Sequence, residues 1–263
     1  RSTPKPSSAA SDVYKRQDVP EDWQPVPAKQ LKTAPDPDDV AEAARVLANA
    51  DNPVIYAGQG VHYAEAWPEL KELAETWNIP VTTSIEGKSA FPEDHPLALG
   101  CGGRSMPKTV RHFLDNADVI FGIGCSFTST NFGITMPIGK TVIHATLDPI
   151  DLNKNVVSQH ALVGDAALTL EALIAELKAQ GQTPPDTSVV EKEIAGMKAA
   201  WLAEWMPKLS CNEAPLNPYR VLWDLANTVD RPNTIITHDA GSPRDQISPF
   251  WESTTPLSYI GWG

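Results

Sequence analysis

The sequence predicts an α/β protein with a mostly parallel sheet flanked by helices, on two observations. First, several apolar runs show little alternation and close on glycine or aspartate, which is typical of strands buried on both faces. The clearest are residues 54–57, 119–121 and 141–144. Second, segments of helical periodicity stand between these runs with short connections, as in βαβ units. Because such crossovers are right-handed, we expect helices on both faces of the sheet.

The individual elements can be placed in order along the chain. Asp36 or Asp38 can cap a first helix that runs to about Asn49. The next helices are expected at 64–77, 108–116 and from Asp165 to about Gln180, with strands at 54–57, 79–83, 119–121 and 141–144 and a long loop at 84–104. After these come a mostly exposed helix at 189–205, ended by Met206-Pro207, a helix at 219–228 and a strand at 234–237.

Shifts in composition divide the chain into five segments. Residues 1–17 are rich in serine, proline and basic residues without a hydrophobic period, and we interpret them as a non-native or disordered leader. A proline-rich linker (18–35), a central nucleotide-binding-like domain (36–180), a linker with a helix (181–215) and the start of a second α/β domain (216–263) follow. Both ends look cut. Near the second, we expect the large side chains of Trp251, Tyr259, Ile260 and Trp262 to form exposed surface.

Charge and cysteine content exclude several function classes. The net charge of -12 argues against binding nucleic acid or an anionic membrane. No apolar stretch approaches the ~20 residues that a membrane span needs. The three cysteines, Cys101, Cys125 and Cys211, are odd in number and lack C-x-x-C spacing, which favours free thiols in a reducing cytoplasm.

Three strand ends carry loops that form the candidate binding site. In open α/β sheets, ligands bind just beyond the carboxyl ends of the strands. We expect a nucleotide cleft there, with backbone N–H groups and a helix starting near Ala64 facing phosphates, and an acid facing a ribose. Its residues would be Gly58, Gln59, Gly60, Gly124, Ser126 and Asp148. The alternative is that the glycines only shape turns and Asp148 caps the turn or helix after it.

Other reactive side chains give weaker signals. The six histidines are scattered without metal-ligand spacing, so we expect no metal site. Cys125 lies in a glycine-rich loop, but nothing beside it in the sequence would lower the pKa of its thiol, which disfavours a nucleophile. We interpret the acidic pair Glu93-Asp94 as loop charges.

The order of several motifs resembles one enzyme family. The segments Asn52-Pro53-Val54-Ile55-Tyr56-Ala57-Gly58-Gln59-Gly60, Phe91-Pro92-Glu93-Asp94-His95-Pro96 and Asp148-Pro149 carry the resemblance. Together they resemble the central domain of thiamine-diphosphate enzymes related to acetolactate synthase. The resemblance covers about 36–177 and continues at 216–263 into the opening of the family's diphosphate-binding domain.

The resemblance implies a fragment of an enzyme, a transferase or lyase. The whole protein would act on a small 2-oxo acid, by decarboxylation with carboligation, using thiamine diphosphate and Mg²⁺. In the family the activating glutamate and the metal motif lie in segments that this chain lacks. We therefore expect no catalytic residue and no metal ligand here, and an inactive fragment. Asp239, Ala240, Gly241 and Ser242 stand where relatives place a loop that meets the diphosphate. The resemblance also implies a homodimer or homotetramer, because active sites in the family form between subunits.

Two departures from the family disfavour FAD. Flavin-containing relatives have an arginine in the loop after the third glycine-ended strand, and the loop here, from Gly122 to Phe127, has none. Thr146 also replaces the first acid of the relatives' H-I-D-I-D-P strand. The alternatives to FAD are another nucleotide or an empty domain. Because fold alone does not fix function, a different class also stays open: a stand-alone, non-catalytic nucleotide-binding or regulatory domain of the same fold. A third interpretation, a degraded reading frame, depends only on the unusual leader.

Overall fold

The computed structural model describes residues 22–24, 26, 32–181 and 188–261. The chain divides into a unit of Arg1–Leu31 and a compact unit of Lys32–Gly263. The predicted leader at 1–17 and most of the linker at 18–35 lie outside the described residues. Within the described ranges, no helix is long and apolar enough to cross a membrane.

The core of the compact unit is a six-stranded sheet in the order β3-β2-β1-β4-β5-β6, with every neighbouring pair parallel. The strands are β1 (Pro53–Ala57), β2 (Val81–Thr83), β3 (Ala98–Cys101), β4 (Val119–Ile123), β5 (Thr141–Thr146) and β6 (His160–Val163). This order, with two halves leading outward from β1 and β4, is that of a doubly wound fold. The predicted α/β class is confirmed.

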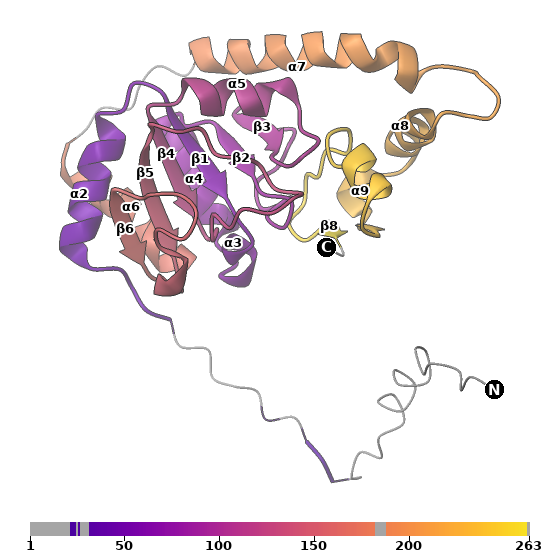
Figure 1. The fold of residues 1–263 in the computed structure, drawn as a ribbon. Coiled ribbons are helices and arrows are strands. Elements are labelled where there is room, and N and C mark those ends of the chain that lie inside the picture. The colour runs from indigo at the N-terminus through magenta and orange to yellow at the C-terminus, as the bar shows by residue number, and fades with distance from the viewer. Residues whose placement is uncertain (1–21, 25, 27–31, 182–187, 262–263) are drawn as a thin grey trace, which may run out of the picture. The chain divides into compact units, whose positions relative to one another are not determined.

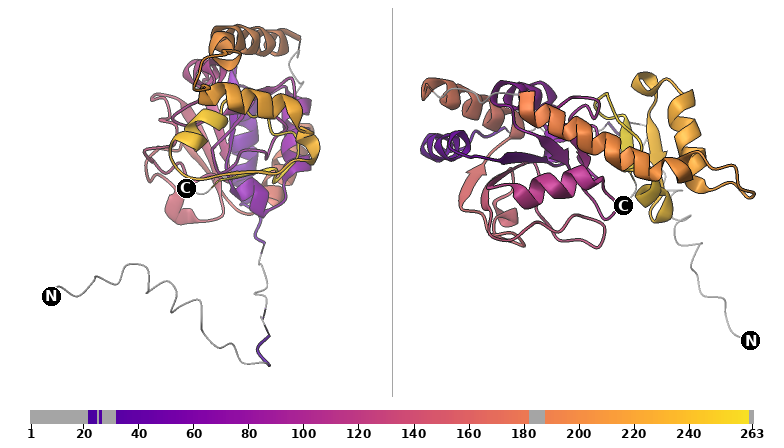
Figure 2. Two further views of the ribbon diagram at one scale, coloured as in Figure 1. Left: turned by 90° about the vertical axis from the view of Figure 1, so that its right-hand side faces the viewer. Right: turned by 90° about the horizontal axis from the view of Figure 1, so that it is seen from above.

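Helices cover both faces of the sheet, as the crossover rule requires. Alternate strand residues point to opposite sides, so Ile55, Phe121 and Ile143 share one core while Val54, Ile120 and Val142 share the other. The first core is closed by α2 (Pro37–Ala48), α4 (Trp67–Trp77) and α6 (Ala166–Ala179). The second is closed by α5 (Lys108–Asn116) and by α7 (Ser188–Leu209), which lies beside α5 (Figures 1 and 2).

Two predicted helices have different bounds. The helix expected at 64–77 is interrupted: α3 spans Gly60–Tyr63 and α4 begins at Trp67. Glu65 has a left-handed φ of 54° at the break, and Pro68 is tolerated only because it lies in the first turn of the new helix. The expected stop at Met206-Pro207 is also wrong, because α7 continues through Pro207. The complete burial of Leu209 helps to offset the hydrogen bond that proline removes.

The segment after α7 forms a small layer of its own. It contains α8 (Pro218–Thr228), the 3₁₀ turn η2 (Arg231–Asn233), β7 (Ile236–His238), α9 (Ser242–Ile247) and β8 (Tyr259–Gly261). Strands β7 and β8 pair in parallel. Trp251 and Tyr259, which we expected on exposed surface, are buried in the core of this layer together with Ala226 and Ile247. Ile260 is exposed, and Trp262 lies outside the described residues.

Candidate functional site

A cavity of about 740 Å³ opens at the carboxyl edge of the sheet. Its floor is formed by the loops that follow β1, β4 and β5, because parallel strands end at the same edge. All six residues predicted there line it: Gly58, Gln59, Gly60, Gly124, Ser126 and Asp148. The topology therefore brings these residues together, while their role in binding stays a prediction.

The three predicted glycines are required by packing of one loop against another. A Cβ on Gly58 would lie 2.6 Å from Cα of Cys125, and a Cβ on Gly60 would lie 2.7 Å from Cα of Gly124. Gly124 itself has a φ of +61°, which favours glycine. The space that a side chain would occupy at these glycines is thus already filled by the neighbouring loop.

Their backbone amides are also occupied. The N–H of Gly58 donates to the carbonyl of Ile123 at 2.9 Å, that of Gly60 to Gly124 at 2.8 Å, and that of Gly124 to Ala145 at 2.9 Å. The expectation that these amides face phosphates is wrong, because each already has a backbone acceptor. The helix expected near Ala64 does not supply the amides either, since α4 begins later and contributes no residue to the cavity.

Asp148 and Ser126 have local roles in their loops. One carboxylate oxygen of Asp148 accepts from the N–H of Ile150 at 3.0 Å and so caps the 3₁₀ turn η1 (Pro149–Asp151). Ser126 Oγ donates to Thr128 Oγ1 at 2.8 Å. The alternative that Asp148 caps the turn after it is therefore confirmed. The Asp148 side chain stays exposed at the cavity, so a contact with a ligand hydroxyl remains a separate prediction.

The charge of the cavity does not match a dinucleotide. Its acidic lining residues are Glu86, Asp148 and Asp151, and no lysine, arginine or histidine of the described chain lines it. A diphosphate here would face carboxylates without a side-chain cation. Together with the occupied glycine amides, this lining does not fit the diphosphate of FAD, in agreement with the sequence departures.

The second predicted group lies apart from this cavity. Asp239, Ala240, Gly241 and Ser242 join β7 to α9, and none of them lines the cavity. Asp239 Oδ1 accepts from the N–H of Ala240 at 2.7 Å. Gly241 has a φ of +87° with no atom within 4 Å of an added Cβ, so its exposed backbone is open to a ligand. Over the described ranges, no group of three or more histidine, cysteine or acidic residues is placed to hold a metal ion.

Comparison with known proteins identifies the family. Residues 40–173 match the model of the thiamine pyrophosphate enzyme central domain. The chain belongs to this family. It is 35% identical over 253 residues to a probable acetolactate synthase large subunit of Methanocaldococcus jannaschii, covering 91% of this chain and 42% of that protein. An acetolactate synthase of Mycobacterium bovis is 34% identical over 249 residues, covering 92% of this chain and 39% of that protein. The chain thus spans about two fifths of the length of the curated relatives it matches.

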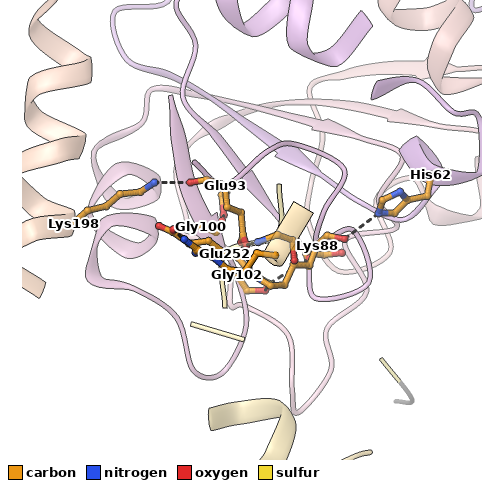
Figure 3. A network of polar contacts seen from close by, with 12 residues as sticks. His62, Lys88, Glu93, Gly100, Gly102, Lys198 and Glu252 are labelled. Atoms are coloured by element: carbon orange, nitrogen blue, oxygen red, sulfur yellow. Dashed lines mark hydrogen bonds and ion pairs between the residues drawn. The ribbon is translucent and has the colours of Figure 1, made fainter. Parts of the chain in front are cut away.

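The structure contains a buried ion pair between Lys88 and Glu93 that the sequence did not predict (Figure 3). The side chains of Lys88 and Glu93 are 1% and 6% exposed, and Lys88 Nζ donates to Glu93 Oε1 at 2.6 Å and to Oε2. Glu93 Oε2 also accepts from the N–H of Ser253 at 2.7 Å, and Lys88 Nζ lies 5.2 Å from the ring centroid of Tyr259. The interpretation of Glu93 as a loop charge is wrong, because it holds Lys88 and the C-terminal layer together.

His62 extends this network at the other end (Figure 3). Trp67 Nε1 donates to His62 Nδ1 at 2.9 Å, so His62 Nε2 carries the proton that is directed at the Lys88 carbonyl, 3.0 Å away. Burial lowers the pKa of His62, which favours this neutral form. In the sequence, the signal for this buried network was the Phe91-Pro92-Glu93-Asp94-His95-Pro96 segment, whose residues no turn or periodicity rule requires.

The two cysteines near the sheet are structural. Both Cys101 and Cys125 are buried, and burial raises the pKa of the Cys101 thiol to about 12 and raises that of Cys125 as well. Thiols held in the protonated form are poor nucleophiles. The Cys125 carbonyl instead accepts from His144 Nε2 at 2.8 Å.

Proposed function

We propose that this chain is the central part of a thiamine-diphosphate-dependent enzyme that acts on small 2-oxo acids by decarboxylation with carboligation, as an acetolactate synthase does. The observation that carries the proposal is the family match over residues 40–173, supported by relatives named acetolactate synthases. A cytoplasmic homodimer or homotetramer is part of the same proposal.

The contribution of this chain to the cofactor site is limited. When bound, thiamine diphosphate supplies an electron sink for decarboxylation. The backbone at Gly241 would approach its diphosphate, because that stretch is open and free of a Cβ. The described residues supply no cluster of Mg²⁺ ligands, so the metal would be held by residues outside them. We accordingly propose that the 263-residue chain alone is inactive, and that it serves as the scaffold on which the loop of Asp239–Ser242 is held.

The experiment starts with the source DNA, read through both ends of this coding segment. The protein encoded there is purified and assayed with pyruvate and a panel of other 2-oxo acids, in the presence of thiamine diphosphate and Mg²⁺. We expect carbon dioxide release that depends on both, and no turnover by the 263-residue chain. Failure of the whole protein to decarboxylate any member of the panel contradicts the proposed reaction. Turnover by the 263-residue chain contradicts the proposed inactivity of the fragment.

One observation favours a second candidate, a binding module for a nucleoside or nucleotide: the large cavity at the carboxyl edge of the sheet. Its acidic lining favours a ligand that presents hydroxyl groups over one that presents phosphates. Calorimetric titration with adenosine and with ADP tests this directly. If this candidate is right, adenosine binds at least as tightly as ADP, and Asp148→Ala weakens it. If neither compound binds, the cavity gives no support to a nucleotide-binding role.

A further inference from the structure

A second, smaller cavity lies between the family domain and the C-terminal layer. Its volume is about 230 Å³, and it shares no lining residue with the large cavity. It is bounded by α7, α8, β3 and the stretch 248–252. Small-molecule pockets typically measure about 300–1,000 Å³, so this one limits a ligand to a compact molecule.

The walls of this cavity are rich in aromatic rings. Trp201, Trp223, Phe250 and Trp251 all line it. Trp201 and Phe250 are stacked, with ring centroids 4.9 Å apart and planes 17° from parallel. The faces that these two rings turn to each other are covered, and the remaining aromatic surface of the lining is apolar, so that another aromatic ring packs favourably against it.

One cation in the lining has no carboxylate partner. Lys198 Nζ donates to the backbone carbonyl of Glu93 at 3.0 Å (Figure 3). Among the described residues, it forms no ion pair. The other charges in the lining are committed elsewhere: the Glu93 carboxylate binds Lys88, and Arg231 Nη1 binds Glu252 Oε2 at 2.9 Å. Burial, with a smaller effect of the like charge on Lys88, lowers the pKa of Lys198 against the opposing effect of Glu252, Glu93 and Asp94, so its charged form is incompletely compensated.

We propose that this cavity binds a small aromatic monocarboxylate, with its carboxylate on Lys198 and its ring against the tryptophans. A carboxylate supplies the ion pair that Lys198 lacks, and such charge-assisted hydrogen bonds are the stronger class. An aromatic ring matches the aromatic lining, and the volume of about 230 Å³ excludes a nucleotide. The site is independent of the proposed enzymatic reaction, because it uses none of the cofactor-loop residues.

The test uses phenylacetate as the probe and the purified 263-residue chain. Because three of the eight tryptophans line the cavity, binding should change intrinsic fluorescence, and calorimetry gives the dissociation constant. Phenylacetamide, of the same shape without the charge, is the matched ligand control. Lys198→Met removes the cation, Lys198→Arg retains one, and Lys192→Met changes an exposed lysine of the same helix.

We expect saturable binding of phenylacetate, weakened at least about tenfold by Lys198→Met and by the exchange to phenylacetamide. Lys198→Arg should keep most of the affinity and Lys192→Met all of it. The proposal is overturned if phenylacetate does not bind at millimolar concentration, or if the amide binds as tightly as the acid. The comparison of acid and amide uses the unmodified chain, so it tests the proposal even if Lys198→Met does not fold.

Discussion

Removing one partner of the buried pair Lys88–Glu93 should destabilise the chain far more than removing a surface pair. Both side chains are almost completely excluded from water, at 1% and 6% exposure. Lys88→Met would leave the carboxylate with only the N–H of Ser253, and Glu93→Gln would leave a buried ammonium without a counter-charge. Each single change is expected to cost about 3–5 kcal/mol of unfolding free energy. Because domains are stable by only about 5–15 kcal/mol, either loss is a large fraction of the total.

The double variant Lys88→Met/Glu93→Gln measures the interaction energy of the ion pair apart from the contacts that each side chain makes with its surroundings. It removes both charges, and glutamine keeps an oxygen acceptor for the N–H of Ser253. Its cost should therefore fall well below the sum of the two single costs, with a coupling of at least about 2 kcal/mol. The matched control is the exposed pair of Lys108 and Glu204, whose side chains are 64% and 54% exposed and whose loss should cost no more than about 1 kcal/mol.

Urea denaturation followed by tryptophan fluorescence and far-ultraviolet circular dichroism measures these differences. With an m-value of about 2–3 kcal/mol/M, each buried single variant should lower the midpoint by about 1–2.5 M. The reasoning is refuted if the buried variants shift the midpoint no more than the Lys108 and Glu204 variants do. It is equally refuted if the two buried single costs simply add in the double variant, because a direct ion pair requires coupling.

Three further predictions concern single residues, each checked by the same denaturation assay. Gly58→Ala should lower the free energy of unfolding by about 1–3 kcal/mol, because the added Cβ overlaps the loop at Gly124. Gly196→Ala in helix α7 should instead raise it by about 0.5–1 kcal/mol, because no atom lies within 4 Å of the added Cβ. Asp165→Ala should cost about 1–2 kcal/mol, because its carboxylate accepts from two N–H groups of the first turn of α6 at 3.1 and 3.3 Å; asparagine there should cost less. For His62, burial lowers the folded-state pKa, so the unfolded chain takes up a proton first as pH falls below about 6.5. Stability should therefore be lost as pH falls from that value towards the folded-state pKa, and His62→Gln should flatten the pH dependence; an unchanged slope would contradict this.

The central strands of the sheet were predictable, and its edges were not. The runs at 54–57, 119–121 and 141–144 became β1, β4 and β5, because strands covered on both faces must be apolar almost throughout. Strand β3 fell inside the predicted loop at 84–104, and β6 was not foreseen. Both lie at the ends of the sheet, where each has only one neighbouring strand. Their four-residue lengths, with Gly100 in one and His160 in the other, give no hydrophobic period to detect.

The position of the large cavity could be predicted from the topology of the sheet. The buried ion pair could not, because it depends on a tertiary contact. Parallel strands end at one edge, so residues that follow three different strands had to meet there. Lys88 and Glu93 are close in sequence, but the group that completes their site, the N–H of Ser253, is 160 residues further along. No local pattern encodes that separation. The family resemblance marked the segment around Glu93 as specific without giving its physical reason, which the structure now supplies.

The glycines at the strand ends show why such a pattern is ambiguous between packing and phosphate binding. Strands β1 and β4 are neighbours, with Ala57 opposite Ile123, so the loops that follow them leave the sheet side by side. Each loop then has to pass the other at backbone distance, and glycine at 58, 60 and 124 permits this. That contact takes up the N–H groups of Gly58 and Gly60, and the N–H of Gly124 donates to Ala145 of β5, so each amide that a phosphate would need already has an acceptor. Two glycine-ended strands that are neighbours in a parallel sheet therefore predict loop packing first. A ligand in this cavity has to be recognised by side chains beyond the glycines, among them the exposed carboxylates of Glu86 and Asp148.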